Sequence, residues 1–231
     1  MTRAPPRLPG TVGRMLMGPS DADVVLPAGL RRPAAAVSLL AVSVLGTFAV
    51  RYAGHDAPSH VDAHLDAAAG SLAAAQRWLS RATLFGSPPF VVLVAVALAV
   101  VCVLLHRRLL ALLAVLGPGL TGVTTTLLKP VVGRTIDGGL AYPSGHTAGA
   151  TAVGLVVSLL AVNLMRVERV TAALLIAAGT LLAGGGVGLA MVVTGVHYPT
   201  DAVGGFCTGV AVVLGTALFV ERIAERRRRA D

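Results

Sequence analysis

Six long apolar stretches dominate this chain, at residues 33–50, 88–105, 109–128, 147–165, 170–194 and 202–220. Each is close to the ~20 residues that an α-helix needs to cross the hydrocarbon core of a bilayer. With 55% hydrophobic and only 13% charged residues, the chain lacks the charge that a soluble domain of 231 residues needs to cover its surface. The sequence therefore predicts an all-α, polytopic membrane protein built as a bundle of six transmembrane helices.

The lysine and arginine residues predict how this bundle is oriented. If the N-terminus is cytoplasmic, the cytoplasmic segments hold fourteen of the nineteen basic residues. This asymmetry fits the excess of Lys and Arg in cytoplasmic loops. We therefore expect a multi-pass protein of the plasma membrane with both termini in the cytoplasm. The net charge of +8 then follows from membrane orientation, and we expect no nucleic-acid partner.

The segments outside the spans divide the chain into three parts. Residues 1–32 combine Pro and Gly with scattered Arg and are interpreted as a flexible cytoplasmic tail. They do not fit a signal peptide, because no apolar core closely follows the first basic residues. Residues 33–221 form the membrane domain. Residues 222–231 form a basic cytoplasmic tail whose arginines favour anionic lipid head groups.

The longest expected outer loop covers residues 51–87. Ser59 followed by an Ala-rich run predicts a capped helix that extends to Leu79. The start of this helix carries four polar residues at alternate positions: His60, Asp62, His64 and Asp66. A solvated polar face explains them better than a metal site, because no third or fourth ligand is evident.

Other unusual residues within the spans favour packing over ligand binding. The third span contains Pro118, which we expect to kink the helix. It also contains four threonines, whose hydroxyls we expect to bond to the backbone of their own helix. The fifth contains glycines at 184–186 and 188, which favour close helix packing. Cys102 and Cys207 both lie in apolar stretches, so buried thiols are expected rather than a disulfide.

Two short polar segments lie at the ends of apolar stretches, Tyr-Pro-Ser-Gly-His at 142–146 and Gly-Val-His-Tyr-Pro-Thr-Asp at 195–201. The only lysine, Lys129, ends another apolar stretch shortly before the first segment. All three lie at expected outer turns, where helix ends that are distant in the chain can meet. Ionisable residues at the edge of a membrane usually serve function.

The first polar segment has the features of an anion site. Ser144 suits the N-cap position, so the fourth span should begin there with Gly145 and His146 in its first turn. Free amide hydrogens and the helix dipole attract an anion at such an end, and Gly145 lets it approach the backbone. Beside an anion, His146 would stay protonated and donate a proton.

The second polar segment has the features of an activated histidine. Pro199 suits the first turn of a helix, so the sixth span should begin near Tyr198. Asp201 then reaches back toward His197, as the acid of a capping box does. A carboxylate on one ring nitrogen fixes the tautomer and leaves the other nitrogen free as a nucleophile or a base.

Taken together, Lys129, residues 143–146 and the pattern Gly195-x-His197-x-x-x-Asp201 resemble the three signature motifs of the type 2 phosphatidic acid phosphatase (PAP2) superfamily. The six expected spans extend this resemblance over nearly the whole chain. It implies a membrane enzyme that acts on a lipid phosphate.

The same resemblance implies a role for each motif residue. His197 would attack phosphorus to form a phosphohistidine, and Asp201 would orient it. His146 would protonate the leaving oxygen and then activate water. The phosphoryl oxygens would be held by a lysine, a hydroxyl and a backbone amide: Lys129, Ser144 and Gly145. No metal or other cofactor is implied, which agrees with the lack of a carboxylate cluster.

Two arginines of the family pattern are missing. Ile136 stands where the first motif has an arginine, and Ala190 and Met191 stand where the third opens with Ser-Arg. Losing one such donor can cost on the order of 10²–10³ in rate. Arg134 is the candidate substitute in substrate binding, provided that its loop bends toward the site.

The sequence therefore predicts a metal-independent lipid phosphatase with its active site on the extracytoplasmic side. Its substrate would be a phosphate or pyrophosphate of the polyprenyl or diacylglycerol type. A lipid phosphotransferase, in which an alcohol replaces water, is one alternative. A catalytically impaired protein that only binds lipid phosphate is another. A transporter is disfavoured, because no charged residue lies in the middle of any span.

Overall fold

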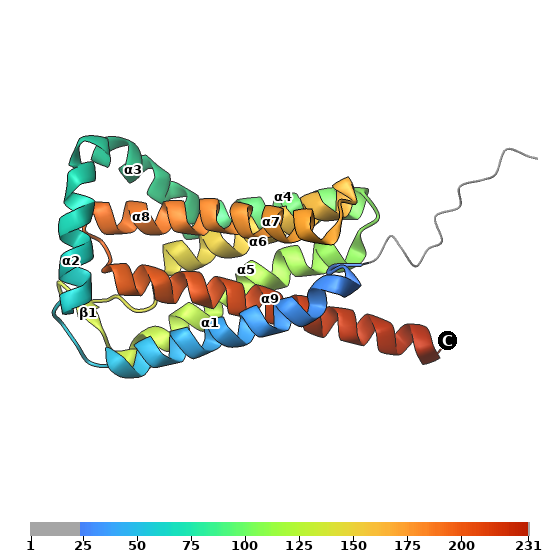
Figure 1. The fold of residues 1–231 in the computed structure, drawn as a ribbon, viewed down its shortest axis with the longest axis horizontal. Helices are drawn as coiled ribbons and strands as arrows, with labels where there is room; N and C mark the ends of the chain where they lie inside the picture. Colours follow the sequence, from blue (N-terminus) through green and yellow to red (C-terminus); the bar gives the residue numbers. More distant parts are fainter. Residues whose placement is uncertain (1–23, 231) are drawn as a thin grey trace, which may run out of the picture.

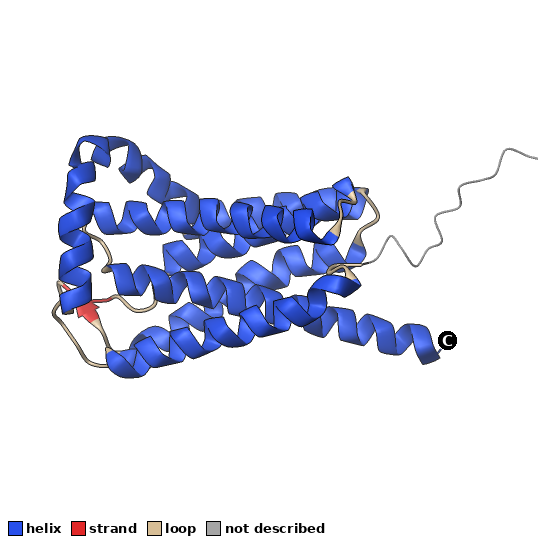
Figure 2. Ribbon diagram, in the orientation of Figure 1, coloured by secondary structure: helices blue, strands red, loops and turns tan. Residues whose placement is uncertain are grey.

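A computed structural model describes residues 24–230 as a bundle of long helices (Figures 1 and 2). The α-helices are α1 Arg31–Arg51, α2 His60–Ala69, α3 Gln76–Ala82, α4 Pro88–Leu104, α5 Arg108–Val132, α6 Gly145–Met165, α7 Arg169–Thr180, α8 Gly186–Val193 and α9 Pro199–Ala230. Short 3-10 helices cover Ala28–Leu30, Gly70–Ala75 and Thr83–Gly86, and a π-helical turn at Leu181–Gly185 joins α7 to α8. A small antiparallel hairpin pairs β1 Thr135–Ile136 with β2 Gly139–Leu140.

The expected six-span membrane bundle is confirmed. Five segments are each long and apolar enough to cross a membrane: α1, α5, α6, α7 with α8, and α9. The candidate for the sixth span is the pair Gln76–Gly86 and Pro88–Leu104, which passes the same test when the two helices are taken together and is bent by 55°. The chain is therefore a multi-pass membrane protein.

The structure describes the expected C-terminal tail more fully than the expected N-terminal tail. Residues 1–23 of the expected N-terminal tail lie outside the described residues. At the other end, α9 continues as one helix to Ala230, so the arginines at 226–229 belong to it. Figure 1 shows its last turns projecting beyond the other helices.

Helices α6 and α9 form the centre of the bundle, and small residues let them approach their neighbours. Gly209 of α9 faces Ala148 of α6 so closely that an added Cβ would lie 2.8 Å from the Ala148 carbonyl oxygen. Gly184 and Gly188 face Thr151 and Thr147 of α6 in the same way. The expectation of close helix packing is therefore confirmed for Gly184 and Gly188, but not for Gly185 and Gly186, where an added Cβ would meet nothing within 4 Å.

The threonines of the third span bond to their own helix. The hydroxyls of Thr121 and Thr124 donate to the carbonyls of Gly117 and Leu120, each at 2.8 Å. The expected back-bonding of the third-span threonines is therefore present. Both cysteines are free thiols and are buried.

The loop after α1 contains the expected capped helix, but the helix is shorter than expected. Ser59 and Asp62 form a capping box at the start of α2. The prediction of a single helix that reaches Leu79 is wrong, because the chain turns through a 3-10 segment at Gly70–Ala75 before α3. Gly70 favours this break, and the turn lets α3 pack against α8.

Tight helix contacts at the core glycines give a test of this packing. A Cβ added at Gly154 would collide with the Ala183 side chain, whereas a Cβ added at Gly46 of α1 meets nothing within 4 Å. We expect Gly154→Ala to destabilise the fold by about 1–3 kcal/mol, the usual cost of overpacking. Gly46→Ala, the matched control, should be neutral or slightly stabilising. Thermal unfolding in detergent compares the two variants, and equal stability would contradict the packing.

Candidate active site

A helix end and the hairpin place Lys129 at one end of the bundle. Helix α5 stops at Val132, and Gly133 follows in the left-handed region with a φ of 65°. The chain then folds back through the hairpin, where the Lys129 Nζ donates to the Leu140 carbonyl at 2.7 Å. This contact holds the ammonium group beside the start of α6.

The start of α6 carries the first polar segment. Ser144 is the N-cap, and its hydroxyl oxygen accepts from the Thr147 amide and hydroxyl at 3.4 and 3.0 Å. Gly145 and His146 lie in the first turn and are half-buried. The expected helix start is therefore confirmed. The Ser144 side chain is fully buried, so its oxygen serves the cap.

The start of α9 carries the second polar segment. Gly195 turns the chain with a φ of 71°, and Pro199 is the first residue of α9, as expected. Asp201 Oδ2 accepts the Tyr198 amide at 3.1 Å and lies 3.8 Å from His197 Nδ1. Nδ1 makes no hydrogen bond, so the Asp201 carboxylate lies beside the histidine without bonding to it. Catalytic hydrogen bonds are often long in unliganded sites.

Four of the expected site residues line one groove of about 960 Å³: Lys129, Gly145, His146 and His197. Its side walls are apolar surfaces of α4 and α5, which include Val92, Val96, Val115 and Val123. Val115 lies fourteen residues before Lys129 on α5, so the wall is about 21 Å long at 1.5 Å per residue. The groove therefore joins a polar end to a long apolar channel. It can hold an anion beside the histidines and an apolar chain along the helices.

Arg134 does not line this groove. Its side chain is fully buried, and Nη1 lies 2.8 Å from Asp201 Oδ1. Nη2 lies 2.7 Å from Asp62 Oδ2, and Nη1 also donates to the Thr200 hydroxyl at 2.6 Å. The loop thus bends Arg134 toward two carboxylates of the protein itself.

Two aromatic rings enclose this guanidinium. The Arg134 Cζ lies 4.5 Å from the ring centroid of Tyr52 and 4.7 Å from that of Tyr198. Tyr52 comes from the end of α1 and Tyr198 from the residue before α9. Cation–π contacts strengthen when the cation is desolvated, as it is here.

The expectation that Asp62 belongs to a solvated face is wrong. Its side chain is fully buried and accepts the amide of Thr200 at 2.9 Å and the hydroxyl of Thr200 at 3.1 Å. Burial alone would raise the pKa of Asp62, but hydrogen bonds from Thr200, Arg134 and Ser59 outweigh it and hold the pKa below its ordinary value. His60 and His64 are exposed, as expected.

The involvement of Asp62 could not be found from the motifs. Its one local signal is the capping-box spacing from Ser59, which explains the helix start but not the arginine. Sequence reasoning missed the part that four residues near the site play: Asp62, Thr200, Tyr52 and Tyr198. Within residues 24–230, no group of three His, Cys, Asp or Glu residues is arranged to hold a metal ion.

The positions of the two missing arginines hold apolar residues with different surroundings. Ile136 is half-buried in the hairpin and lines the groove. Met191 is 3% exposed and packs with Ala150 and Val187 in the core. Among the groove-lining residues that the structure describes, Lys129 is the one lysine or arginine.

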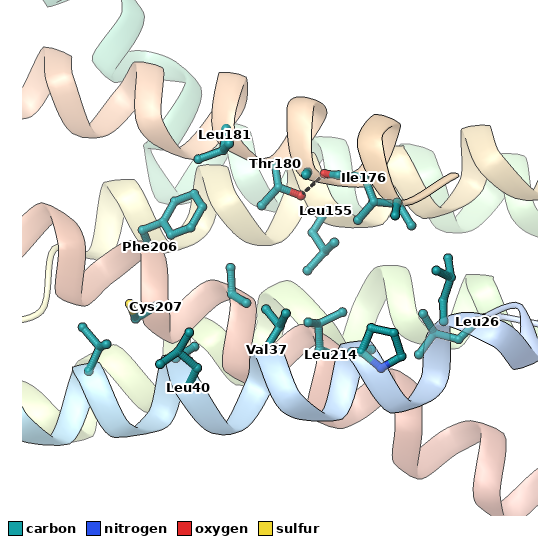
Figure 3. A pocket seen from close by; sticks show the side chains of 18 residues that line it. Leu26, Val37, Leu40, Leu155, Ile176, Thr180, Leu181, Phe206, Cys207 and Leu214 are labelled. Carbon is teal, nitrogen blue, oxygen red and sulfur yellow. Dashed lines mark hydrogen bonds between the residues drawn. The ribbon is translucent and has the colours of Figure 1, made fainter. Parts of the chain in front are cut away.

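A second cavity, of about 430 Å³, lies among α1, α6, α7 and α9 (Figure 3). Leu40, Leu155 and Phe206 are among its lining residues, and the hydroxyl of Thr180 is bonded to the Ile176 carbonyl. Its described lining carries no histidine and no charged group. It cannot bind or transfer a phosphoryl group. The histidine groove is the candidate active site because it brings together Lys129, His146 and His197.

Comparisons with known proteins bear on the family and the fold of the chain. A family model described as the PAP2 superfamily matches residues 34–225. A solved structure, described as the first transmembrane PAP2-type phosphatidylglycerolphosphate phosphatase from Bacillus subtilis, is similar with a TM-score of 0.56. The two are 18% identical, and the match covers 84% of this chain and 96% of that one. A sequence search of curated proteins found no match.

The lowered pKa of Asp62 predicts how stability changes with pH. Its ordinary pKa is 3.8 and its folded pKa is lower, so the ionised form stabilises the fold. That contribution is complete above the ordinary value and is lost as pH falls through the folded value. We expect Asp62→Asn to unfold at a lower temperature than the wild type at pH 7. Breaking a buried pair costs up to about 3–5 kcal/mol.

The difference between the two proteins should stay constant above about pH 4 and should shrink as pH falls further, through the lowered pKa of Asp62. Thermal unfolding in detergent across this range measures it. Asp56→Asn, which changes an exposed acid in the same loop, is the control. A difference that stays constant with pH would contradict the assignment of an ionised Asp62.

Proposed function

Because the chain belongs to the PAP2 superfamily and is, at that level, a phosphoric ester hydrolase of the membrane, we propose that it is a lipid phosphatase. Its substrate is a phosphate or pyrophosphate of the polyprenyl or diacylglycerol type. The observation that carries this proposal is the groove itself. The two motif histidines and Lys129 lie at its polar end, and its walls continue as apolar helix surface.

The proposed first step forms a phosphohistidine. His197 Nε2 attacks phosphorus, because Nδ1 faces Asp201. The bond from phosphorus to the leaving oxygen breaks, and His146 gives that oxygen its proton. The phosphorylated imidazole carries a positive charge, which the Asp201 carboxylate stabilises.

The proposed second step restores the enzyme. His146, now neutral, takes a proton from water, and the water oxygen attacks phosphorus. The bond between phosphorus and Nε2 breaks, inorganic phosphate leaves, and His197 returns to its neutral form. Neither step uses a metal or another cofactor.

Few groups in the groove can stabilise the negative charge of the phosphoryl group. Lys129 supplies an ammonium group, and the free amides at the start of α6 supply the positive end of a helix dipole. Ile136 and Met191 contribute no charge. We therefore expect slower turnover than a site with two further arginines would support.

The apolar walls support a lipid substrate. A wall of about 21 Å along α5 accommodates a long hydrocarbon tail while the phosphate reaches the histidines. The start of α1 and the end of α9 lie together at the opposite end of the bundle, with Arg31 and Arg222 (Figure 1). By the positive-inside rule, that end faces the cytoplasm, and the histidine groove faces the extracytoplasmic side.

The phosphohistidine mechanism gives a direct test of the roles of His197 and Asp201. His197→Ala should release no phosphate from a long-chain lipid phosphate and should trap no acid-labile phosphate on the protein. Asp201→Asn should retain a small residual rate, because the nucleophile remains while its tautomer is no longer fixed. His64→Ala, an exposed histidine of α2, is the control and should behave as wild type. Acid-labile phosphate on His197→Ala would contradict the nucleophile assignment.

The groove predicts a dependence on tail length. Gly122 of α5 lines the groove, and nothing lies within 4 Å of a Cβ added there. Gly122→Phe should fill the channel and displace about two methylenes, which costs about 1.6 kcal/mol. The KM for a long-chain lipid phosphate should rise roughly 15-fold, and that for a short-chain analogue should not change.

Gly46→Phe is the matched control, because Gly46 also has no neighbour within 4 Å but lies outside the groove. Equal effects on long and short substrates would contradict a tail in this channel. Added alcohols identify the alternative activity, because a phosphotransferase converts them into new phosphate esters.

A further inference from the structure

The buried charges behind the histidine groove come from three separate parts of the chain. Asp62 lies on α2, Arg134 lies between α5 and β1, and Asp201 lies in the first turn of α9. All three side chains are fully buried, so water does not compete for their charges. Two carboxylates thus share one guanidinium, and the cluster carries one net negative charge next to His197.

Arg134 fixes the orientation of the Asp201 carboxylate. Its Nη1 binds Oδ1, while Oδ2 is left to the Tyr198 amide and to His197. A carboxylate held at both oxygens cannot rotate freely. The oxygen that faces His197 Nδ1 is therefore set by the contact on the opposite side.

Asp62 in turn fixes both Arg134 and the start of α9. Its Oδ2 binds the Arg134 Nη2 at 2.7 Å, and its Oδ1 accepts the amide of Thr200, the residue before Asp201. One carboxylate oxygen of Asp62 thus binds Arg134, which contacts Asp201, and the other binds the residue before Asp201 in the chain.

We infer that Asp62 and Arg134 are positioning residues that hold Asp201 in place to orient His197, an inference that rests on the proposed function. The net negative charge of the cluster then complements the positive charge that His197 gains when it is phosphorylated. Asp62 acts on the reaction from the loop between the first two spans, with no contact to the substrate.

This role differs from the phosphoryl clamp that the sequence suggested for Arg134. A clamp must reach the groove, but both Nη atoms of Arg134 are bonded to protein oxygens and its side chain is fully buried. A clamp contributes to the binding of phosphate itself. A positioning residue contributes to the rate of the chemical step.

Steady-state kinetics of the full chain in detergent separate the two roles. Asp62→Asn keeps the shape of the side chain but removes its charge. We expect kcat to fall on the order of 10- to 100-fold, as for other small misplacements of reacting groups. The KM for the lipid phosphate and the inhibition constant of inorganic phosphate should stay within about twofold. Asp56→Asn, the exposed acid in the same loop, should leave kcat unchanged.

A second comparison separates positioning from a loss of stability. In an Asp201→Asn background, Asp62→Asn should lower kcat no further, because the residue through which it acts is already changed. Its effect on the unfolding temperature should persist in that background. Thr200→Val, which removes only a hydroxyl bonded to Asp62 and Arg134, should show the same pattern more weakly and serves if Asp62→Asn does not fold.

The outcomes distinguish the inference from the proposed function. If the wild type releases no phosphate from any lipid phosphate, the proposed function fails. If the wild type is active and His197→Ala is not, but the folded Asp62→Asn or Thr200→Val variant keeps full kcat, the positioning role fails alone. A raised KM with weaker phosphate inhibition at unchanged kcat would also overturn it and restore Arg134 as a clamp.

Discussion

The contact on which this site depends is a guanidinium buried between two carboxylates. Arg134 joins the loop helix α2 to the first turn of α9, and it lies between the rings of Tyr52 and Tyr198. Without the arginine, two buried carboxylates would face each other uncompensated, at a cost of several kcal/mol. The charge of Arg134 therefore keeps the loop and the helix end together, and it determines where Asp201 lies.

The membrane bundle explains why the motif residues gather at one end. Ionisable side chains are costly within the hydrocarbon core, so these spans carry them at their ends. Close packing of α6 against α8 and α9 through glycines then fixes the start of α6 beside the start of α9. The groove between α4 and α5 adds an apolar channel that leads to the same place. A rigid apolar bundle thus positions a small polar site.

The site also differs from the family pattern in how charge is distributed. Where that pattern has two arginines, this chain has Ile136 at the groove and Met191 in the core. Arg134, which the sequence offered as a replacement, is bonded to Asp62 and Asp201. Positive charge at the groove thus depends on Lys129 and the start of α6, while the charge of Arg134 is paired with Asp62 and Asp201 outside the groove.

The sequence by itself determined the features that depend on neighbouring residues: the spans, the caps at Ser59 and Ser144, the start of α9 at Pro199 and the motif residues. These follow from apolar length and from hydrogen bonds over three or four positions. It did not determine that the helix after Ser59 breaks at Gly70, or that Asp62 pairs with Arg134, seventy-two positions away. Those were decided by the tertiary structure, because a buried charge takes the partner that packing brings to it. Nothing in the residues next to Asp62 names that partner.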